Sequence, residues 1–241
     1  MKKTILTLMI FQVFSCSKDI TNTENRNAFI TETLQFKYFQ TKGKLDSAIG
    51  ESEKLFFYYK DSLIDSIHRF VIYKKLDNTT FLGSYRSYKF EYSNGKLIEE
   101  KTGNYVYDFY KDTLYKYWHY PYNSTKYSYI SDTLIEQSWN NNPVKGYLYF
   151  KNKNLIKNIY IDDVLTYEYD NKFNPLNNFV GLNKLYNFRL ISHVLQNNSY
   201  NNVMKYFSRN ETTLFSIEYN NTQNPIKIIS STPFRSEEIK Y

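Results

Sequence analysis

Aromatic residues two positions apart, followed by a polar turn and then by an aliphatic residue, recur along most of the chain. Side chains two apart share one face of a β-strand, so this pattern predicts strands joined by hairpins. Asn94-Gly95 is the clearest hairpin turn. The copies are Phe57-Tyr58-Tyr59 before Leu63, Tyr88–Tyr92 before Leu97, Tyr105–Phe109 before Leu114, Tyr127–Tyr129 before Leu134, Tyr147–Tyr149 before Leu155, Tyr167–Tyr169 before Leu176, and Ile217–Tyr219 before Ile226.

The central copies keep a nearly constant spacing. From Leu97 to Leu176 the aliphatic positions are 97, 114, 134, 155 and 176, and about twenty residues suffice for two short strands and two turns. We therefore predict one all-β domain over residues 30–241, an antiparallel hairpin-repeat meander that is strongly curved or barrel-like. Charged residues interrupt most candidate lipid-facing strands, which makes a transmembrane barrel the weaker alternative.

One segment departs from strand periodicity. Leu185, Phe188, Ile191, Val194 and Leu195 recur at intervals of three and four, the pattern of an amphipathic helix. The spacing predicts a short helix near residues 183–195 that covers an edge or opening of the sheet.

The amino terminus carries an export pattern. Lys2 and Lys3 precede an apolar stretch, Thr4–Phe14, which is too short to span a bilayer. The following Val13-Phe14-Ser15-Cys16 resembles the lipobox of bacterial lipoproteins. The resemblance implies a signal peptide of residues 1–15, acylation of Cys16 and a membrane anchor, with residues 16–29 as a polar tether; the alternative is an unmodified thiol after an ordinary secretory signal.

Ser17-Lys18-Asp19 resembles the short signal that sends Bacteroidota lipoproteins to the outer face of the outer membrane, although Ile20 stands where a second acidic residue is expected. The sequence thus favours the cell surface over the periplasmic face.

The repeats resemble YD-repeat sequences, and in particular Bacteroidota lipoproteins with a domain of unknown function described as porin-like in fold. The strongest likeness is the stretch Tyr167–Leu176, followed by Asn201-Asn202-Val203, Ile217–Asn220 and Asn224-Pro225-Ile226. It extends over roughly residues 50–230. The family implies a fold and an envelope location, and it implies no catalytic residues.

Composition adds limited information. The chain has 241 residues, 19% aromatic residues and a formal charge of +7, which becomes +5 without Lys2 and Lys3. Lys and Arg form no run longer than two residues, so a nucleic-acid partner is not expected. The oligomeric state is left open.

Catalytic and metal-binding patterns are missing from the sequence. His68, His119 and His193 lie far apart, no G-x-S-x-G or phosphate loop occurs, and Cys16 is committed to lipid. Neighbouring carboxylates such as Glu99 and Glu100 point to opposite faces of a strand. We therefore expect no enzyme, no cofactor and no metal.

Two features carry functional hypotheses. Trp118, Trp139, Tyr117 and Tyr120 belong to the densest aromatic region and could stack on a ligand, or could pack in the core or in a cross-strand ladder. Asp followed by Ser or Thr and an aliphatic residue resembles an O-glycosylation sequence of Bacteroidota, although the same residues also make good turns. Its acceptors are Ser47, Ser62, Ser66, Thr113 and Thr133.

The sequence therefore predicts a lipid-anchored envelope protein whose role is open. A non-enzymatic binding module for glycan or protein is favoured because aromatic residues are abundant. The alternatives are a structural envelope scaffold and a hydrolase whose site is assembled from distant residues.

Overall fold

The computed structural model describes residues 29–33, 36–74, 80–108, 113–115, 123–140, 142–161, 163–186, 198–209, 211–231 and 234–241. These residues form strands and two short 3₁₀ helices. The elements are β1 (Glu32–Thr33), β2 (Lys37–Thr41), β3 (Lys44–Ile49), β4 (Glu53–Lys60), β5 (Leu63–Lys74), β6 (Thr80–Ser93), β7 (Lys96–Asp108), β8 (Thr113–Tyr115), β9 (Asn123–Ser131), β10 (Leu134–Trp139), β11 (Asn142–Lys151), β12 (Asn154–Tyr160), β13 (Asp163–Phe173), η1 (Pro175–Asn178), η2 (Leu182–Lys184), β14 (Asn201–Phe207), β15 (Thr212–Tyr219), β16 (Pro225–Ser231) and β17 (Phe234–Lys240).

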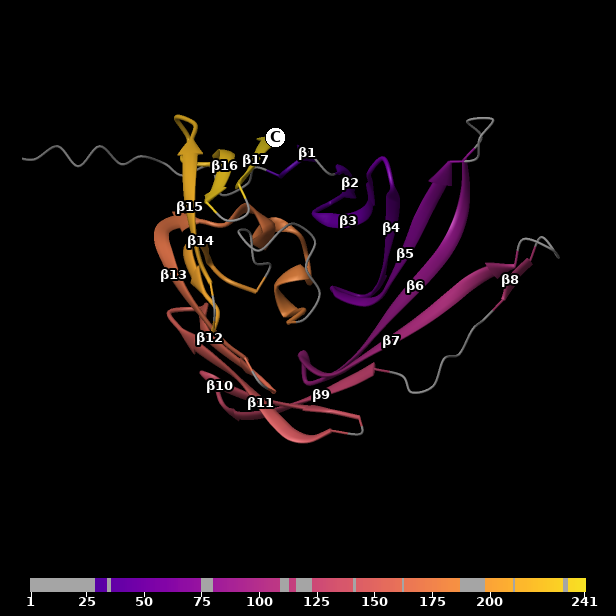
Figure 1. Ribbon diagram of the computed structural model, residues 1–241, viewed down its shortest axis with the longest axis horizontal. Helices are drawn as coiled ribbons and strands as arrows, with labels where there is room; N and C mark the ends of the chain where they lie inside the picture. The colour runs from indigo at the N-terminus through magenta and orange to yellow at the C-terminus, as the bar shows by residue number, and fades with distance from the viewer. Residues whose placement is uncertain are drawn as a thin grey trace, which may run out of the picture.

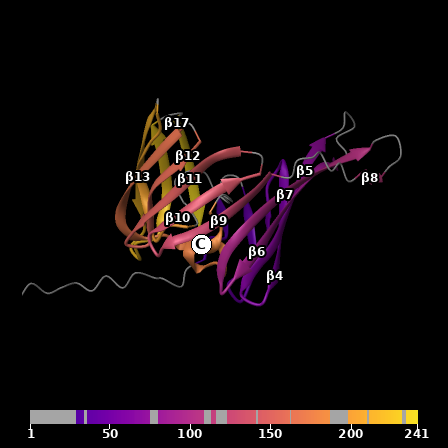
Figure 2. The ribbon, with the colours of Figure 1, turned by 90° about the horizontal axis from the view of Figure 1, so that it is seen from below.

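The strands form one closed antiparallel barrel (Figures 1 and 2). Each strand pairs with the next along the chain, with one exception. The first part of β7 pairs with β9, and its last residues, Val106–Asp108, pair with the short β8. The ring closes where Glu32 of β1 pairs with Lys240 of β17. The predicted all-β meander is therefore confirmed, and among the described strands the short β8 is the one paired on a single side.

Short connections occur at both ends of the barrel. At one end, which we call the tight-turn end, two-residue turns join β2 to β3, β4 to β5, β6 to β7, β9 to β10 and β11 to β12. Both residues of the turns Lys42-Gly43, Asn94-Gly95 and Asn152-Lys153 have positive φ, as in type I′ turns, whose twist matches that of the strands. The opposite end we call the far end.

Bulges next to these turns explain the repeated aromatic residues. In five hairpins the second strand carries one extra residue soon after the turn: Asp46, Asp65, Ile98, Ile156 and Ile226. A bulge interrupts the ladder and leaves backbone groups without strand partners. The residue before each extra residue is bonded by a tyrosine on the neighbouring strand. The Leu45 amide donates to the Tyr59 hydroxyl, whereas Tyr92, Tyr129, Tyr169 and Tyr241 donate to the carbonyls of Ile64, Leu97, Leu155 and Pro225.

These five contacts, which we call the tyrosine–bulge bonds, have lengths of 2.6 to 3.0 Å. They join each hairpin to the next one. The recurring pair of Tyr and aliphatic residue in the sequence is thus a structural device that holds adjacent hairpins in register.

Replacing Tyr92 by Phe should lower the free energy of unfolding by about 1–2 kcal/mol, because the Ile64 carbonyl would lose its phenolic donor. Urea unfolding measures the change. Tyr58→Phe is the matched control, since Tyr58 is 48% exposed on the outer wall, and its effect should be within about 0.5 kcal/mol. Equal effects of the two substitutions would contradict a special role for the buried hydroxyl.

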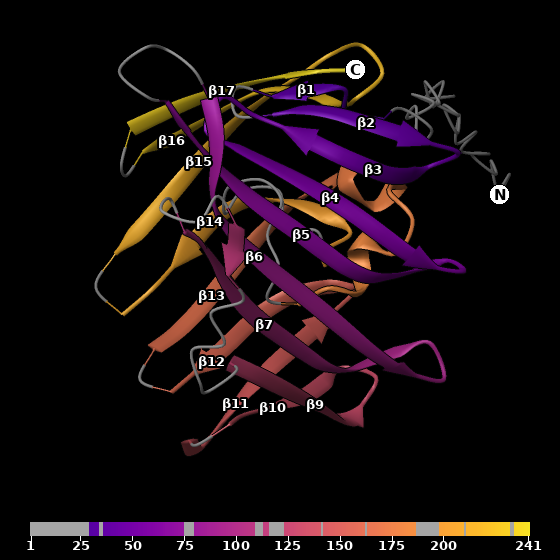
Figure 3. The ribbon, with the colours of Figure 1, turned by 90° about the vertical axis from the view of Figure 1, so that its right-hand side faces the viewer.

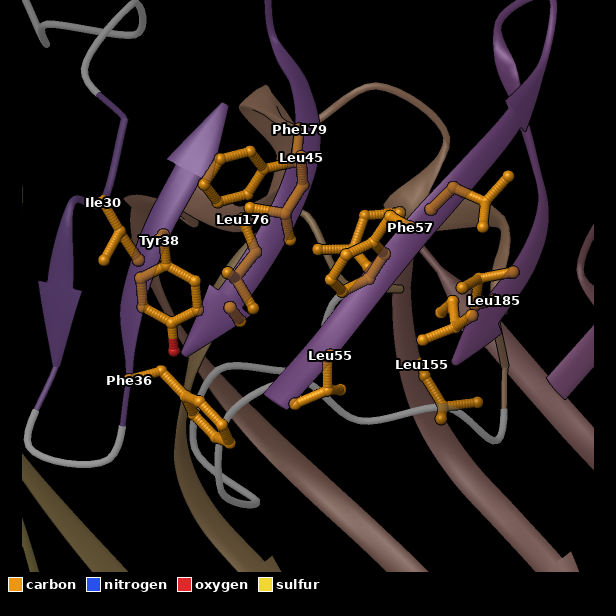
Figure 4. Packing of buried hydrophobic residues seen from close by; sticks show 14 of the residues in the cluster. Ile30, Phe36, Tyr38, Leu45, Leu55, Phe57, Leu155, Leu176, Phe179 and Leu185 are labelled. Carbon is orange, nitrogen blue, oxygen red and sulfur yellow. The ribbon is translucent and has the colours of Figure 1, made fainter. Parts of the chain in front are cut away.

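The segment after β13 fills the tight-turn end of the barrel from inside. Leu176, Phe179, Leu182 and Leu185 are at most 1% exposed and join the core that lines the strands. Figure 4 shows Leu176, Phe179 and Leu185 among side chains of β2, β3, β4 and β12. We call residues 174–186 the plug.

Backbone contacts fix the plug to the hairpin turns. The Val180 amide donates to the Gly43 carbonyl at 2.8 Å, and the Asn174 side chain accepts from the Leu176 amide at 3.1 Å, which starts η1. Gly181 has a φ of +77° and lies against Ser62 and Ile64, where a Cβ would come within 3.1 Å of the Ser62 carbonyl oxygen. Close approach and positive φ both require glycine there.

The predicted helix at residues 183–195 does not begin where the periodicity placed it. Leu182–Lys184 is a single 3₁₀ turn, and Leu185 is extended; residues 187–197 lie outside the described part. The buried plug residues are spaced by three rather than by three and four. That interval brings side chains to one face of a 3₁₀ path. The expectation that this segment covers an opening of the sheet agrees with the position of the plug.

The outer wall of the barrel is charged. Outward positions on adjacent strands form Lys–Glu pairs, among them Lys101 with Glu91 and Glu99, Lys145 with Glu136, Lys205 with Glu168, Lys227 with Glu218, and Lys240 with Glu32. Such charges suit contact with water, because Lys on a lipid-facing strand costs about 2–4 kcal/mol at mid-membrane. Among the described residues, no helix has both the length and the apolar character needed to cross a bilayer.

Candidate functional site on the inner wall

The inner wall changes from apolar to polar between the two ends. Near the tight-turn end it carries buried Leu45, Ile64, Leu97, Ile135 and Leu155. Farther from the turns, Arg69 forms an ion pair with Glu53, and Arg86 is the cross-strand partner of Arg69. Charged and amide side chains that point into the barrel need hydrogen-bond or ion-pair partners. The part of the inner wall where they gather, away from the plug, is therefore the candidate site.

A cross-strand row on the inner wall joins a carboxylate to an indole. Phe90, Glu100, Thr125 and Trp139 are successive partners on β6, β7, β9 and β10. Glu100 is only 5% exposed, and the Tyr127 hydroxyl donates to its Oε2 at 3.1 Å. Burial, followed by the Glu100 charge, raises the pKa of Tyr127 well above its ordinary value. Tyr127 therefore stays a hydrogen-bond donor at physiological pH.

Glu99 and Glu100 point to opposite walls, as the strand geometry predicts. On the outer wall Glu99 accepts from the Ser124 hydroxyl and pairs with Lys101 at 3.1 Å. Burial alone would raise the pKa of Glu99, but the hydrogen bonds from Ser124 and Lys101 lower it. The two carboxylates cannot act as an acid/base pair on one substrate.

Two amide side chains lie beside this row. Gln137 is fully buried, and its Nε2 donates to Asn158 Oδ1 at 3.2 Å. Its Oε1 is buried with no hydrogen-bond partner in the part of the chain that the structure describes. An unsatisfied buried acceptor costs about 1–3 kcal/mol, so a donor brought by water or ligand would stabilise this position.

Trp139 lies against Tyr160, with ring centroids 4.6 Å apart and an interplanar angle of 71°. Trp139 is half-buried and Tyr160 is 44% exposed. Gly146 makes this arrangement possible, because a Cβ there would come within 2.4 Å of the indole Cη2 and 2.5 Å of the Ile159 carbonyl oxygen. Two partly exposed aromatic rings thus lie together on one side of the Gln137–Asn158 pair.

Gly146→Ala should therefore displace the indole and lower the free energy of unfolding by about 1–3 kcal/mol, the usual cost of overpacking. Trp fluorescence and urea unfolding measure the two effects. Ser138→Ala, on the opposite wall of β10, should change neither; an unchanged emission spectrum of Gly146→Ala would contradict the close contact.

The other residues singled out from the sequence fall in different places. Cys16, Trp118, Tyr117 and Tyr120 lie outside the described residues, as do His119 and His193. His68 is on the outer wall of β5, beside Tyr58. Among the described residues no three His, Cys, Asp or Glu side chains gather as metal ligands.

The glycosylation-like positions differ in accessibility. Ser62 and Thr133 are exposed in hairpin turns at the tight-turn end, and Ser66 is half-buried on β5. Ser47 is only 9% exposed, between Phe39 and Phe56 in the cross-strand row. Thr113 is in β8, where its side chain lies outside the description.

Sequence reasoning missed Glu100, Gln137, Asn158 and Tyr160 as neighbours of Trp139. The alternation of β10 places Gln137 and Trp139 on one face and was an available signal. The cross-strand partners depend on register, which bulges shift in several of the hairpins.

Fold and inner wall together define a closed antiparallel β-barrel with one filled end and a polar inner wall toward the other. The chain matches no known family model and no curated protein. Among solved structures it is similar to a porin-like protein from Bacteroides vulgatus, with 10% identity over 89% of this chain and 99% of that chain and a TM-score of 0.42. A porin-like protein from Bacteroides uniformis has 8% identity over 85% of this chain and 76% of that chain, with a TM-score of 0.35.

Proposed function

We propose that the protein is an exported, lipid-anchored barrel that binds a glycan on the inner wall around Trp139. The observation that carries this proposal is the set of partly exposed aromatic rings beside buried amide and carboxylate groups. Sugars present apolar ring faces that stack on aromatic side chains and hydroxyl groups that bond to amides and carboxylates. Trp139 and Tyr160 offer the first. Gln137 and Glu100 are the nearest groups of the second kind, and because both are buried a sugar hydroxyl reaches them only when the inner wall opens locally.

The proposed role is binding without catalysis. Glu100 is the inward carboxylate of the row, its neighbour Glu99 faces the other wall, and Tyr127 is held in its protonated form. A glycosidase of the usual kind needs two carboxylates that flank one bond. The described groups of the cross-strand row can bond to sugar hydroxyls, but they do not include two carboxylates that face one another across a bond.

The decisive measurement is binding of wild type and Trp139→Ala to a panel of immobilised oligosaccharides. Wild type should bind a subset, and Trp139→Ala should lose about 1–3 kcal/mol of binding free energy, a typical value for an aromatic stacking contact. Tyr147→Ala, on the outer wall of the adjacent strand β11, is the matched control and should bind normally. If the panel gives no wild-type binding, or if both variants bind like wild type, the barrel is better explained as an envelope scaffold.

The anchor is tested separately. Wild type should be digested by protease on intact cells, while Cys16→Ala should no longer be retained at the membrane. Protection of wild type until the outer membrane is opened would contradict the surface location inferred from Ser17-Lys18-Asp19.

A further inference from the structure

The outer wall of β2, β4 and β5 differs from the rest of the barrel. Five aromatic side chains point outward there, and we call them the aromatic wall: Phe39, Phe56, Tyr58, His68 and Phe70. Phe56 and Phe70 make an edge contact at 5.8 Å, and Tyr58 and His68 lie 4.6 Å apart. Phe39 is 49% and Tyr58 48% exposed. Figure 3 views the barrel from the side on which these strands lie.

Positive charge accompanies these rings. Lys37, Lys54 and Lys60 occupy outward positions on β2 and β4 between the aromatic residues. The outward ladder positions of β2 and β4, and those of β5 from Ser66 to Phe70, hold no carboxylate. At several other places on the outer wall an outward Lys faces a Glu, as Lys145 faces Glu136. Asp46 of β3 is an exposed carboxylate within the wall, where it accepts from Thr41. This wall therefore combines a net excess of positive charge with exposed rings.

We propose that the aromatic wall docks on an anionic lipid surface. Aromatic rings settle at the level of lipid headgroups, and Lys side chains extend past them to phosphate groups. The wall is convex, so several strands can touch a flat bilayer at once. The excess of outward Lys over outward carboxylates, of which Asp46 of β3 is one, favours an anionic surface over a protein partner with mixed charge.

The course of the chain places this wall near the proposed anchor. Phe29 lies at the tight-turn end near Gly43, and β1 pairs with β2, the first strand of the aromatic wall. From Cys16 to Phe29 the contour length is at most ~45 Å, so a lipid at Cys16 would keep the aromatic wall within reach of the bilayer. The docking rests on the chemistry of the wall and is independent of the proposed glycan site.

The test uses the chain from Ser17 to Tyr241, which contains every described strand and carries no acyl group. It is sedimented with vesicles of phosphatidylcholine alone or of an equimolar mixture with phosphatidylglycerol. Binding should be at least about tenfold stronger to the anionic vesicles, because each Lys near the surface is attracted to the lipid phosphates. Added salt should weaken the binding, because it screens this attraction.

Two variants locate the contact. Phe39→Ser with Tyr58→Ser, and separately Lys54→Gln with Lys60→Gln, should each reduce binding about tenfold. The control changes the same residue types on the outer wall of β11 and β12, Tyr149→Ser with Lys157→Gln, and should bind like wild type. Equal binding to both kinds of vesicle, no binding to either, or an equal loss in the control variant would overturn the proposal. Urea midpoints confirm that each variant is folded.

Discussion

Phe179→Ala is expected to lower the free energy of unfolding by about 3–5 kcal/mol, the largest effect of any single substitution considered for this barrel. Phe179 is 1% exposed and lies in the plug, with ring centroids 5.6 Å from Phe29 and 6.4 Å from Tyr38. Removing the ring would leave a cavity between the plug and the first strands. Because the plug touches several hairpins, the walls can close around that cavity only partly.

Urea unfolding of wild type, Phe179→Ala and Phe39→Ala measures the effect. Phe39→Ala deletes the same group at a position that is 49% exposed, so it should cost less than about 1 kcal/mol. If both variants lost the same stability, the plug would not be part of the folding core.

Alkaline solution is expected to unfold the protein over a narrow range above pH 10. Among the described residues, seven tyrosines have a raised pKa: Tyr59, Tyr92, Tyr127, Tyr129, Tyr186, Tyr219 and Tyr241. Burial is the main cause in each, and it raises the pKa of Tyr59 to about 12. Three of these phenols, Tyr92, Tyr129 and Tyr241, donate tyrosine–bulge bonds, which a phenolate cannot do.

The direction of the pH effect follows from proton binding. An unfolded tyrosine loses its proton near pH 10, whereas the folded state holds these protons to higher pH. Above pH 10 the folded chain therefore binds more protons than the unfolded chain, and the free energy of unfolding falls as pH rises. Below pH 10 these groups contribute no pH dependence.

Urea midpoints at pH 8, 10 and 11, together with tyrosinate absorbance, check this expectation. Part of the tyrosine absorbance change should appear only as the chain unfolds, and Tyr92→Phe should make the fall in stability less steep. Titration of every tyrosine near pH 10 in a folded chain would contradict it.

The hairpins could be predicted from the sequence, because aromatic alternation and turn residues are local signals. Tyr92, Asn94-Gly95 and Leu97 do form one hairpin with its bulge, as the repeat indicates. Closure could not be read from any repeat, since it depends on the pairing of β1 with β17. The plug was not predicted as such: of the helix expected at residues 183–195 the structure describes only residues 183–186, which form a 3₁₀ turn and an extended Leu185.

The candidate site was only partly visible in the sequence. Trp139 was selected as a stacking residue, and the structure places it on the inner wall beside Tyr160. Its polar neighbours come from β7, β9 and β12, and no spacing along the chain reports that they meet. The glycosylation-like positions share one sequence pattern, yet Ser47 and Ser62 differ in exposure because one lies within a strand row and the other in a turn.

Closure of the ring through β1 and β17 also governs how the chain can fold. Glu32 and Lys240 are more than 200 positions apart, so the last seam requires contact between the two extremes of the domain. Hairpins made of local contacts can form early, but the barrel has two open edges until the final strand arrives. The chain therefore passes through a stage with exposed strand edges, during which pairing between different molecules competes with closure.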